Sequence, residues 1–145
     1  MKPKKEYCIE GITTGAVQSV YQVSRIQKIC DELGLEVFNP LWQKNQVELL
    51  RDLIKNKFDV IITGVAAYGL DKSWLGRKID GSFIKDIKEL NKKYKINPAG
   101  EGGEFESFVL NCPLFSKKLD VKGKEISSSG DNHRMEISVS IGQSS

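Results

Sequence analysis

Arginine, histidine and cysteine are scarce in this sequence of 145 residues. Only four of its 22 basic residues are arginine, and the formal net charge is +3. Base readout and phosphate contacts favour arginine, so we expect the lysines to lie on solvated helix faces and not on a nucleic-acid surface. No apolar run approaches the roughly 18–20 residues that span a bilayer, and no long apolar stretch follows the basic start. The sequence therefore predicts no membrane span and no secretory signal peptide.

The three cysteines, Cys8, Cys30 and Cys112, are far apart and include no C-x-x-C pair. This spacing favours neither a disulfide framework nor a zinc site. Cys8 and Cys30 stand among apolar residues and are predicted to lie in the core. The one histidine, His133, lies in a polar, turn-like stretch, which argues against a catalytic triad built on it. We expect a cytoplasmic protein without a metal site.

Apolar periodicity predicts helices that alternate with strands in the first two thirds of the chain. Apolar residues that recur every three or four positions predict helices over 17–33, 47–54 and 83–94. Apolar runs predict strands over 6–13 and 58–63, and a short extended segment over 35–38. Gly34 is expected to end the first helix and Ser82 to cap the third. The continuous apolar character of 58–63 favours a strand buried on both faces of a parallel sheet.

After residue 96 the apolar period changes to two, which is typical of antiparallel strands. Strands are predicted over 105–110, 117–122 and 134–141. The polar stretch 127–132 is predicted to be the turn before the last strand. The fold class is therefore α/β, with a parallel-sheet part over 1–96 followed by a small antiparallel β region over 97–145.

Two loops follow predicted strands, at the sheet edge where open α/β sheets bind ligands. The loop 12–19 leads into a helix whose N-terminus could hold a phosphate or carboxylate, with an ordinary tight turn as the alternative. The loop 64–77 contains three glycines, a tyrosine and a tryptophan, and its length favours a functional segment. The alternative for this second loop is that its apolar side chains only cover the end of the sheet.

A third loop, 97–107, interleaves three glutamates with three glycines. Glycine lets the backbone approach a ligand closely, and the carboxylates could hold a cation, a metal ion or a positively charged substrate. The spacing of the carboxylates excludes a calcium loop of the EF-hand type. A solvated acidic turn is the alternative.

Four segments of these loops and helices carry a resemblance to a known family. They are G-A-V-Q-S-V-Y-Q-V-S-R (15–25), P-L-W (40–42), G-V-A-A-Y-G-L-D-K-S-W-L-G-R (64–77) and G-E-G-G-E-F-E-S-F-V (100–109). From about Ile9 onward the sequence resembles the diphthine–ammonia ligases, or diphthamide synthetases, which are PP-loop ATP pyrophosphatases. The resemblance implies a parallel-sheet core like that of the adenine nucleotide α-hydrolases. It makes 1–96 a partial nucleotide-binding domain and 97–145 a substrate-binding β region.

Members of this family begin with a strand and an S-G-G-K-D-S pyrophosphate loop, which this sequence does not contain. We therefore expect a fragment, one half of a split gene or the product of a mis-called start. A separate chain carrying that loop, or a second copy of this chain, is then an expected partner.

The resemblance implies an amide ligase that uses ATP, with magnesium as its counter-ion. Its substrate would be diphthine, a modified histidine of translation elongation factor 2, which ammonia converts to diphthamide while AMP and pyrophosphate are released. One alternative is a remnant that binds nucleotide or elongation factor 2 without turnover. Another is a different PP-loop enzyme, such as a tRNA modifier. The absence of a cysteine pair and of a basic face that could bind tRNA disfavours this alternative.

The resemblance implies the nucleotide-binding candidates, and the chemistry of diphthine together with the composition of the loops suggests the others. The nucleotide-binding candidates are Gly15, Ala16, Ser19, Tyr21, Gln22 and Arg25. For Arg25 the alternative to a phosphate contact is a surface ion pair. Diphthine carries a quaternary ammonium group, which aromatic faces and carboxylates bind. The catalytic candidates are Glu101, Glu104 and Glu106. The substrate-binding candidates are Trp42, Tyr68, Gly69, Asp71, Trp74, Gly76, Gly102 and Gly103.

Overall fold

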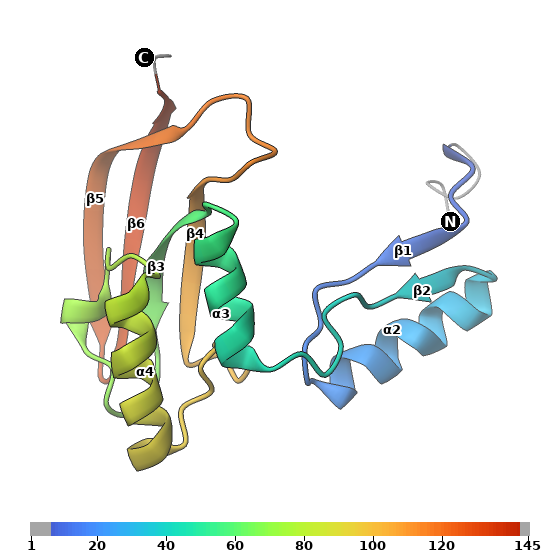
Figure 1. Ribbon diagram of the computed structural model, residues 1–145, viewed down its shortest axis with the longest axis horizontal. Helices are drawn as coiled ribbons and strands as arrows, with labels where there is room; N and C mark the ends of the chain where they lie inside the picture. The colour runs from blue at the N-terminus through green and yellow to red at the C-terminus, as the bar shows by residue number, and fades with distance from the viewer. Residues whose placement is uncertain (1–6, 143–145) are drawn as a thin grey trace. The chain divides into compact units, whose positions relative to one another are not determined.

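The computed structural model describes residues 7–142 of the chain. It contains two compact units, Met1–Asn45 and Gln46–Ser145, which are treated separately below (Figure 1). This division differs from the boundary that the sequence suggested after residue 96, because one sheet contains strands from both sides of that position. No helix within the described residues is long and apolar enough to cross a membrane.

The first unit is a single β-α-β element. Strand β1 (Gly11–Thr13) pairs in parallel with β2 (Glu36–Phe38), and helix α2 (Val20–Leu33) connects them. The helix ends as predicted at Gly34, which adopts the left-handed conformation with φ 59°. The strand predicted over 6–13 is shorter in the structure, which begins it at Gly11 and does not describe residue 6.

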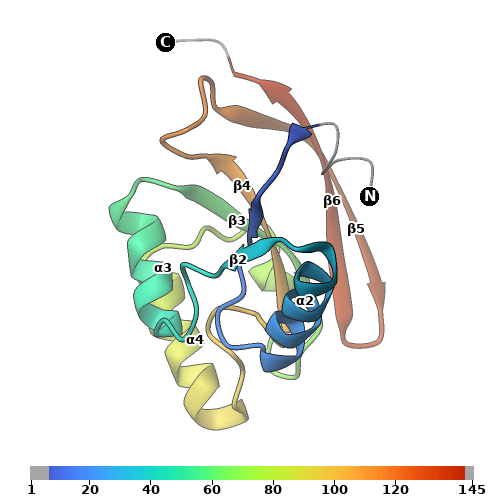
Figure 2. The same ribbon diagram turned by 90° about the vertical axis from the view of Figure 1, so that its right-hand side faces the viewer.

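The second unit is an antiparallel sheet with two helices. Its elements are α3 (Gln46–Lys55), β3 (Asp59–Val65), the short 3-10 helix η1 (Lys72–Trp74), α4 (Gly81–Tyr94), β4 (Phe105–Asn111), β5 (Leu119–Ser129) and β6 (Asn132–Ile141). The strand order is β4–β3–β6–β5, and every neighbouring pair is antiparallel. Figure 2 shows β5 and β6 as one long hairpin, as Figure 1 also does.

The predicted parallel strand 58–63 is wrong in its direction, because β3 runs antiparallel to both of its neighbours. Its apolar character has another cause. On one face, Val60 and Ile62 pack in a core with side chains of α3 and α4. On the other face, Ile61 packs with Leu110 and Met135. A strand covered on both faces is apolar throughout whichever way its neighbours run. The α/β class is confirmed, with a small parallel pair and an antiparallel sheet, but the expected parallel-sheet core is not.

Two local predictions are corrected by hydrogen bonding and strand length. Helix α4 is capped by Asp80 and not by Ser82: Oδ1 of Asp80 accepts a hydrogen bond of 2.9 Å from the Phe83 N–H and one of 2.7 Å from the Ser82 hydroxyl. Most of the predicted turn 127–132 is strand, so that only two residues connect β5 to β6.

The structure separates the cysteines into buried and exposed residues. Cys30 is buried, as predicted, and Cys112 is also buried. Cys8 is exposed, so its predicted place in the core is wrong. All three are free thiols.

Candidate functional site

A cavity of about 340 Å³ lies where β3 ends in the second unit. Its walls come from the end of β3 (64–66), the start of β4 and the tip of the β5–β6 hairpin (127–129 and 132–134). Gly103, Phe105 and Glu106 contribute the β4 wall. The cavity therefore lies entirely within the second unit.

Strand pairing explains why two motifs that are far apart in the sequence meet at this cavity. Gly64 lies opposite Glu106 and Val65 lies opposite Phe105 in the β3–β4 pair. The ladder continues into the loops, where the N–H of Ala66 donates a hydrogen bond of 2.9 Å to the backbone carbonyl of Glu104. The start of the segment 64–77 and part of the segment 100–109 thus line one site, through an antiparallel pairing of β3 that the sequence did not indicate.

The Glu104 carboxylate organises the glycine-rich loop. Its Oε1 accepts a hydrogen bond of 2.9 Å from the backbone N–H of Asn97, and its Oε2 accepts one of 2.8 Å from the N–H of Gly102. A Cβ atom at Gly102 would lie only 2.8 Å from Oε1, so a side chain at this position would displace the carboxylate from its two backbone partners. Both carboxylate oxygens of Glu104 therefore bind the backbone of its own loop.

Glu106 is the predicted glutamate that lines the cavity. Its exposed side chain lies over Gly64, where a Cβ atom would be 3.2 Å from Oε2 of Glu106. Within residues 7–142 its carboxylate has no hydrogen bond or ion pair, so it is available to a ligand. Glu101 is half-buried and lies outside the cavity lining.

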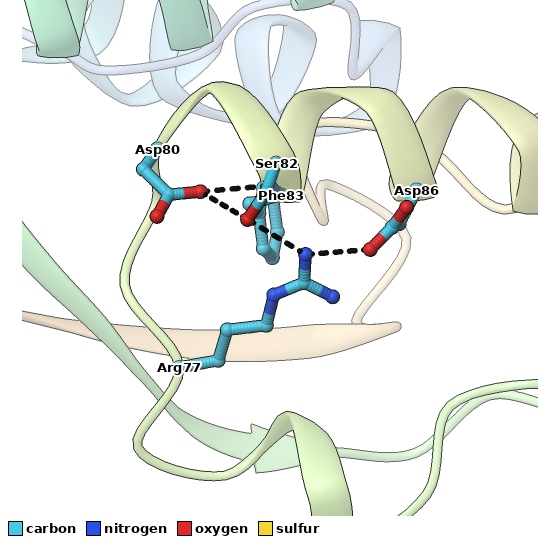
Figure 3. Close-up of polar contacts among 5 residues, drawn as sticks. All are labelled: Arg77, Asp80, Ser82, Phe83 and Asp86. Atoms are coloured by element: carbon cyan, nitrogen blue, oxygen red, sulfur yellow. Dashed lines mark hydrogen bonds and ion pairs between the residues drawn. The ribbon is translucent and has the colours of Figure 1, made fainter.

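The buried Trp74 ring already has a cation on its face. The guanidinium carbon of Arg77 lies 4.5 Å from the centre of the ring, and Phe83 packs edge-on at 5.4 Å. Figure 3 shows the Arg77 guanidinium reaching Ser82 and Asp86, and its Nη2 lies 2.6 Å from Oδ2 of Asp86. Trp74 thus belongs to the core in this structure and does not line the cavity.

The other substrate-binding candidates are spread over both units. Tyr68 is exposed and packs edge-on against Tyr94 at 5.1 Å, outside the cavity. Gly69 and Gly76 have positive φ angles, 96° and 78°, so both support loop conformations that other residues rarely adopt. Trp42 is half-buried and belongs to the first unit.

Asp71 caps the short helix η1 and lies near the only histidine. Hydrogen bonds from the Ser73 hydroxyl and then from the Ser73 N–H lower the pKa of Asp71, and the charge of His133 lowers it further. The Nδ1 atom of His133 lies 2.9 Å from the hydroxyl of Ser128 on the neighbouring strand. The imidazole is thereby held at the cavity wall.

His133 and Arg134 are cavity residues that the sequence analysis missed. Arg134 was already in the predicted strand 134–141, but His133 was assigned to polar, turn-like surroundings, although strand β6 begins at Asn132. The alternation of the last strand was the available signal for His133, since extending the predicted strand back by one residue would have included it. Their place at the cavity depends on the pairing of β6 with β3, which the sequence did not reveal.

In the first unit, the six nucleotide-binding candidates lie together after β1 and on the first turns of α2. The Ser19 hydroxyl caps the helix by accepting a hydrogen bond of 3.3 Å from the Gln22 N–H. Nη1 of Arg25 lies 2.6 Å from the Tyr21 hydroxyl, so its described partner is a tyrosine and not an acidic side chain. Gly15 is exposed with open space around it, whereas Ala16 is buried.

The described residues contain no group of three or more His, Cys, Asp or Glu side chains that could hold a metal ion. This finding concerns sites in residues 7–142 at which protein side chains alone would hold the metal ion. It leaves the magnesium that would accompany a bound nucleotide as an expectation.

Comparison with known proteins gives a consistent result. The family model of the diphthamide synthase C-terminal domain matches residues 45–140. The diphthine–ammonia ligase of Homo sapiens is 43% identical over 127 residues, which are 87% of this chain and 46% of that protein. The one of Rattus norvegicus is 44% identical over 125 residues, 86% of this chain and 46% of that protein. The one of Schizosaccharomyces pombe is 41% identical over 118 residues, which are 81% of this chain and 19% of that protein. The chain therefore spans less than half the length of these relatives.

Proposed function

The chain belongs to the diphthamide synthase family, and we propose that it supplies the substrate-binding part of a diphthine–ammonia ligase. The observation that carries this proposal is the cavity at the end of β3, where the two most characteristic segments of the sequence meet. In this reaction the carboxylate of diphthine on translation elongation factor 2 becomes an amide. ATP is consumed, and AMP and pyrophosphate are released in the cytoplasm, where the elongation factor acts.

The chemistry requires two binding functions. A carboxylate does not react with ammonia directly, so it is first joined to the adenylyl group of ATP, and ammonia then displaces AMP. The first step needs groups that stabilise charge on the phosphates, and both steps need a pocket that positions the substrate carboxylate. The cavity of the second unit is suited to the pocket, because it is lined by Gly64, Phe105, Glu106 and Arg134 and by the tip of the β5–β6 hairpin.

The glutamates then have different roles. Glu106, which is free and lies over Gly64, attracts the quaternary ammonium group of diphthine. Glu104 holds the loop that brings Gly103 to the cavity. Glu101 remains a candidate for contact with the substrate from the same loop.

The first unit is proposed to contribute to nucleotide binding. The N-terminus of α2 presents backbone N–H groups and the positive end of the helix dipole, next to the open backbone of Gly15. The parallel pair β1–β2 has no further strand among the described residues. Phe38, on β2, is 64% exposed. These features fit part of a larger PP-loop sheet, whose pyrophosphate loop comes from another chain or from another part of a longer protein.

The test is to measure binding and turnover separately. The purified chain is titrated with elongation factor 2 in its diphthine-bearing and unmodified forms, and AMP release is followed with ATP and ammonium. We expect binding that prefers the diphthine-bearing form, and AMP release only when a polypeptide with the pyrophosphate loop is added. Binding that remains unproductive with that polypeptide favours a non-catalytic binder.

A matched pair of variants tests the site. Glu106→Gln should weaken binding of the diphthine-bearing factor, and Glu136→Gln, on the exposed part of β6 outside the cavity, should not. Equal affinity for the modified and unmodified factors would contradict the proposal.

A further inference from the structure

We propose that the cavity recognises a zwitterion, with Glu106 attracting the cationic group of the ligand and Arg134 binding its carboxylate. The inference rests on the proposed function only for the identity of the ligand, diphthine. The selection of a zwitterion follows from the arrangement of charges in the cavity. It also adds Arg134 to the site as a specificity-determining residue.

The two charged residues lie on either side of the same glycine. In the register of the sheet, Gly64 lies opposite Glu106 of β4 and opposite Arg134 of β6. Neighbouring strands are about 4.8 Å apart, so the backbones that carry the two charges are separated by roughly 10 Å. Gly64 has no side chain to fill the space between them, and all three residues line the cavity.

Neither charge is neutralised by the protein. Within residues 7–142, the Glu106 carboxylate and the Arg134 guanidinium have no ion pair with each other or with another side chain. Some other charged side chains near the sheet are paired: Arg77 binds Asp86, and Asp59 binds Lys78 and Lys118. The cavity therefore offers one free negative and one free positive group.

A ligand with both charges satisfies this arrangement best. A guanidinium can donate two parallel hydrogen bonds to a carboxylate. A quaternary ammonium group has no N–H to donate, so it is held by the Glu106 charge and by apolar contacts such as the adjoining Phe105. A ligand with only one charge would leave the other protein group partly desolvated without a partner, which costs free energy.

The arrangement distinguishes substrate from product. Diphthine carries its trimethylammonium group and its carboxylate together, whereas the amide product has kept the cation and lost the negative charge. Arg134 would therefore favour the substrate, while Glu106 would hold both. Release of the product follows from the loss of the Arg134 contact.

The test uses two small probes and the full 145-residue chain labelled with nitrogen-15. The probes are 2-(trimethylammonio)butyrate, a zwitterion, and its primary amide, a cation. Dissociation constants are obtained from the shifts of the Gly64 and Gly103 amide signals, which report from the cavity. We expect the zwitterion to bind about tenfold more tightly than the amide, the effect of one charge-assisted contact.

The variants separate the two contacts. Arg134→Gln should remove the preference, so that both probes bind equally. Glu106→Gln should weaken both probes by a similar factor and keep the preference. The controls are Arg51→Gln on the exposed face of α3 and Glu136→Gln, neither of which lines the cavity. Both should match the unmodified chain, and the remaining amide signals report whether each variant is folded.

A preference for the zwitterion that persists in Arg134→Gln would overturn the inference, as would the absence of shifts at Gly64 and Gly103 with either probe. The proposed function can fail independently. If the zwitterion preference depends on Arg134 but the diphthine-bearing elongation factor does not bind, the inference stands and the proposed function fails. If the diphthine-bearing factor binds, and Arg134→Gln changes neither that binding nor the preference for the zwitterion probe, the proposed function stands and the inference fails.

Discussion

The carboxylate of Glu104 accepts a hydrogen bond of 2.9 Å from the backbone N–H of Asn97, seven residues earlier in the chain. Together with the bond from the Gly102 N–H, it closes the loop that leads into β4. The loop therefore has a defined conformation before any ligand binds, and this conformation places Gly103 at the cavity wall. Among the three glutamates of the segment, Glu104 has a structural role that can be measured as stability.

Replacement of Glu104 by Gln should destabilise the second unit. The amide keeps one acceptor oxygen and directs its NH2 group at a backbone N–H, so one bond to a charged acceptor is lost. Such a loss costs about 1–3 kcal/mol, which urea unfolding followed by circular dichroism can measure. The control is Glu136→Gln on exposed β6, for which a change within roughly 0.5 kcal/mol is expected. Equal unfolding free energies for the two variants would contradict the structural role of Glu104.

The structure also shows which features the sequence could predict. The α4 helix and strand β6 follow from apolar periodicity, because each has one more buried and one more solvated face. Strand β4 was also predicted, although its apolar side chains pack on both faces, Phe105 and Val109 on one and Phe108 and Leu110 on the other. The direction of β3 could not be predicted, because a strand covered on both faces gives the same apolar run in parallel and antiparallel sheets.

The candidate site was predictable in its loops but not in its charges. The glycine and glutamate pattern of 100–109 indicated a binding loop, and it lines the cavity through Gly103, Phe105 and Glu106. The sequence could not show that the Glu104 carboxylate is occupied by its own backbone. It also could not show Arg134 beside Gly64, because that contact depends on the long-range pairing of β6 with β3.

Stability should decrease in acid because of Asp59. The Nζ atoms of Lys118 and Lys78 lie 2.8 and 2.9 Å from its carboxylate oxygens. Burial alone would raise the pKa of Asp59, but the hydrogen bonds and charges of the two lysines outweigh it and lower the pKa below its usual value of 3.8. The stabilisation is therefore complete above the unfolded-state pKa, near 4, and is lost as the pH falls through the folded-state pKa.

The measurement is the unfolding free energy between pH 5 and pH 2.5 for the unmodified chain and for Asp59→Asn. The variant should be less stable at pH 5, and its stability should decrease less steeply in acid. Asp120→Asn is the matched control, because Asp120 is more exposed and lies 3.9 Å from its lysine. Parallel acid curves for the unmodified chain and Asp59→Asn would show that the ion pairs contribute nothing.

Substitution of Gly69 by Ala should strain the loop after β3. Gly69 has a φ angle of 96°, and a Cβ atom there would lie 2.7 Å from Cδ2 of Tyr94. The left-handed backbone costs about 1–2 kcal/mol for alanine, and displacement of the ring costs a further 1–3 kcal/mol or so. Thermal unfolding should therefore show a large loss of stability.

Two further glycines separate these contributions. Gly103 has a φ angle of 83° with open space around it, so Gly103→Ala should show only the backbone cost. Gly81 lies in the first turn of α4, also with open space, and Gly81→Ala should be neutral or slightly stabilising. If Gly69→Ala and Gly103→Ala lose the same stability, the contact with Tyr94 has no energetic importance.

Amide exchange should be much faster in the first unit than in the second. The strands β1 and β2 have three residues each and pair only with each other among the described residues. Two-stranded sheets are marginally stable in water, and residues with few buried apolar neighbours open locally at low free energy. Strand β3, in contrast, contains the fully buried Ile62 between two sets of packed side chains.

Hydrogen–deuterium exchange of the intact chain measures this difference. The amide of Ile62 should be protected at least about a hundredfold more than the amides of Ile12 and Val37, as expected for a difference of about 3 kcal/mol in the free energy of local opening. A polypeptide of residues 46–145 should keep the same protection at β3, because the side chains that pack against β3 all come from the second unit.

Equal protection of β1 and β3 in the intact chain would show that the first unit is stabilised by contacts beyond its β-α-β element.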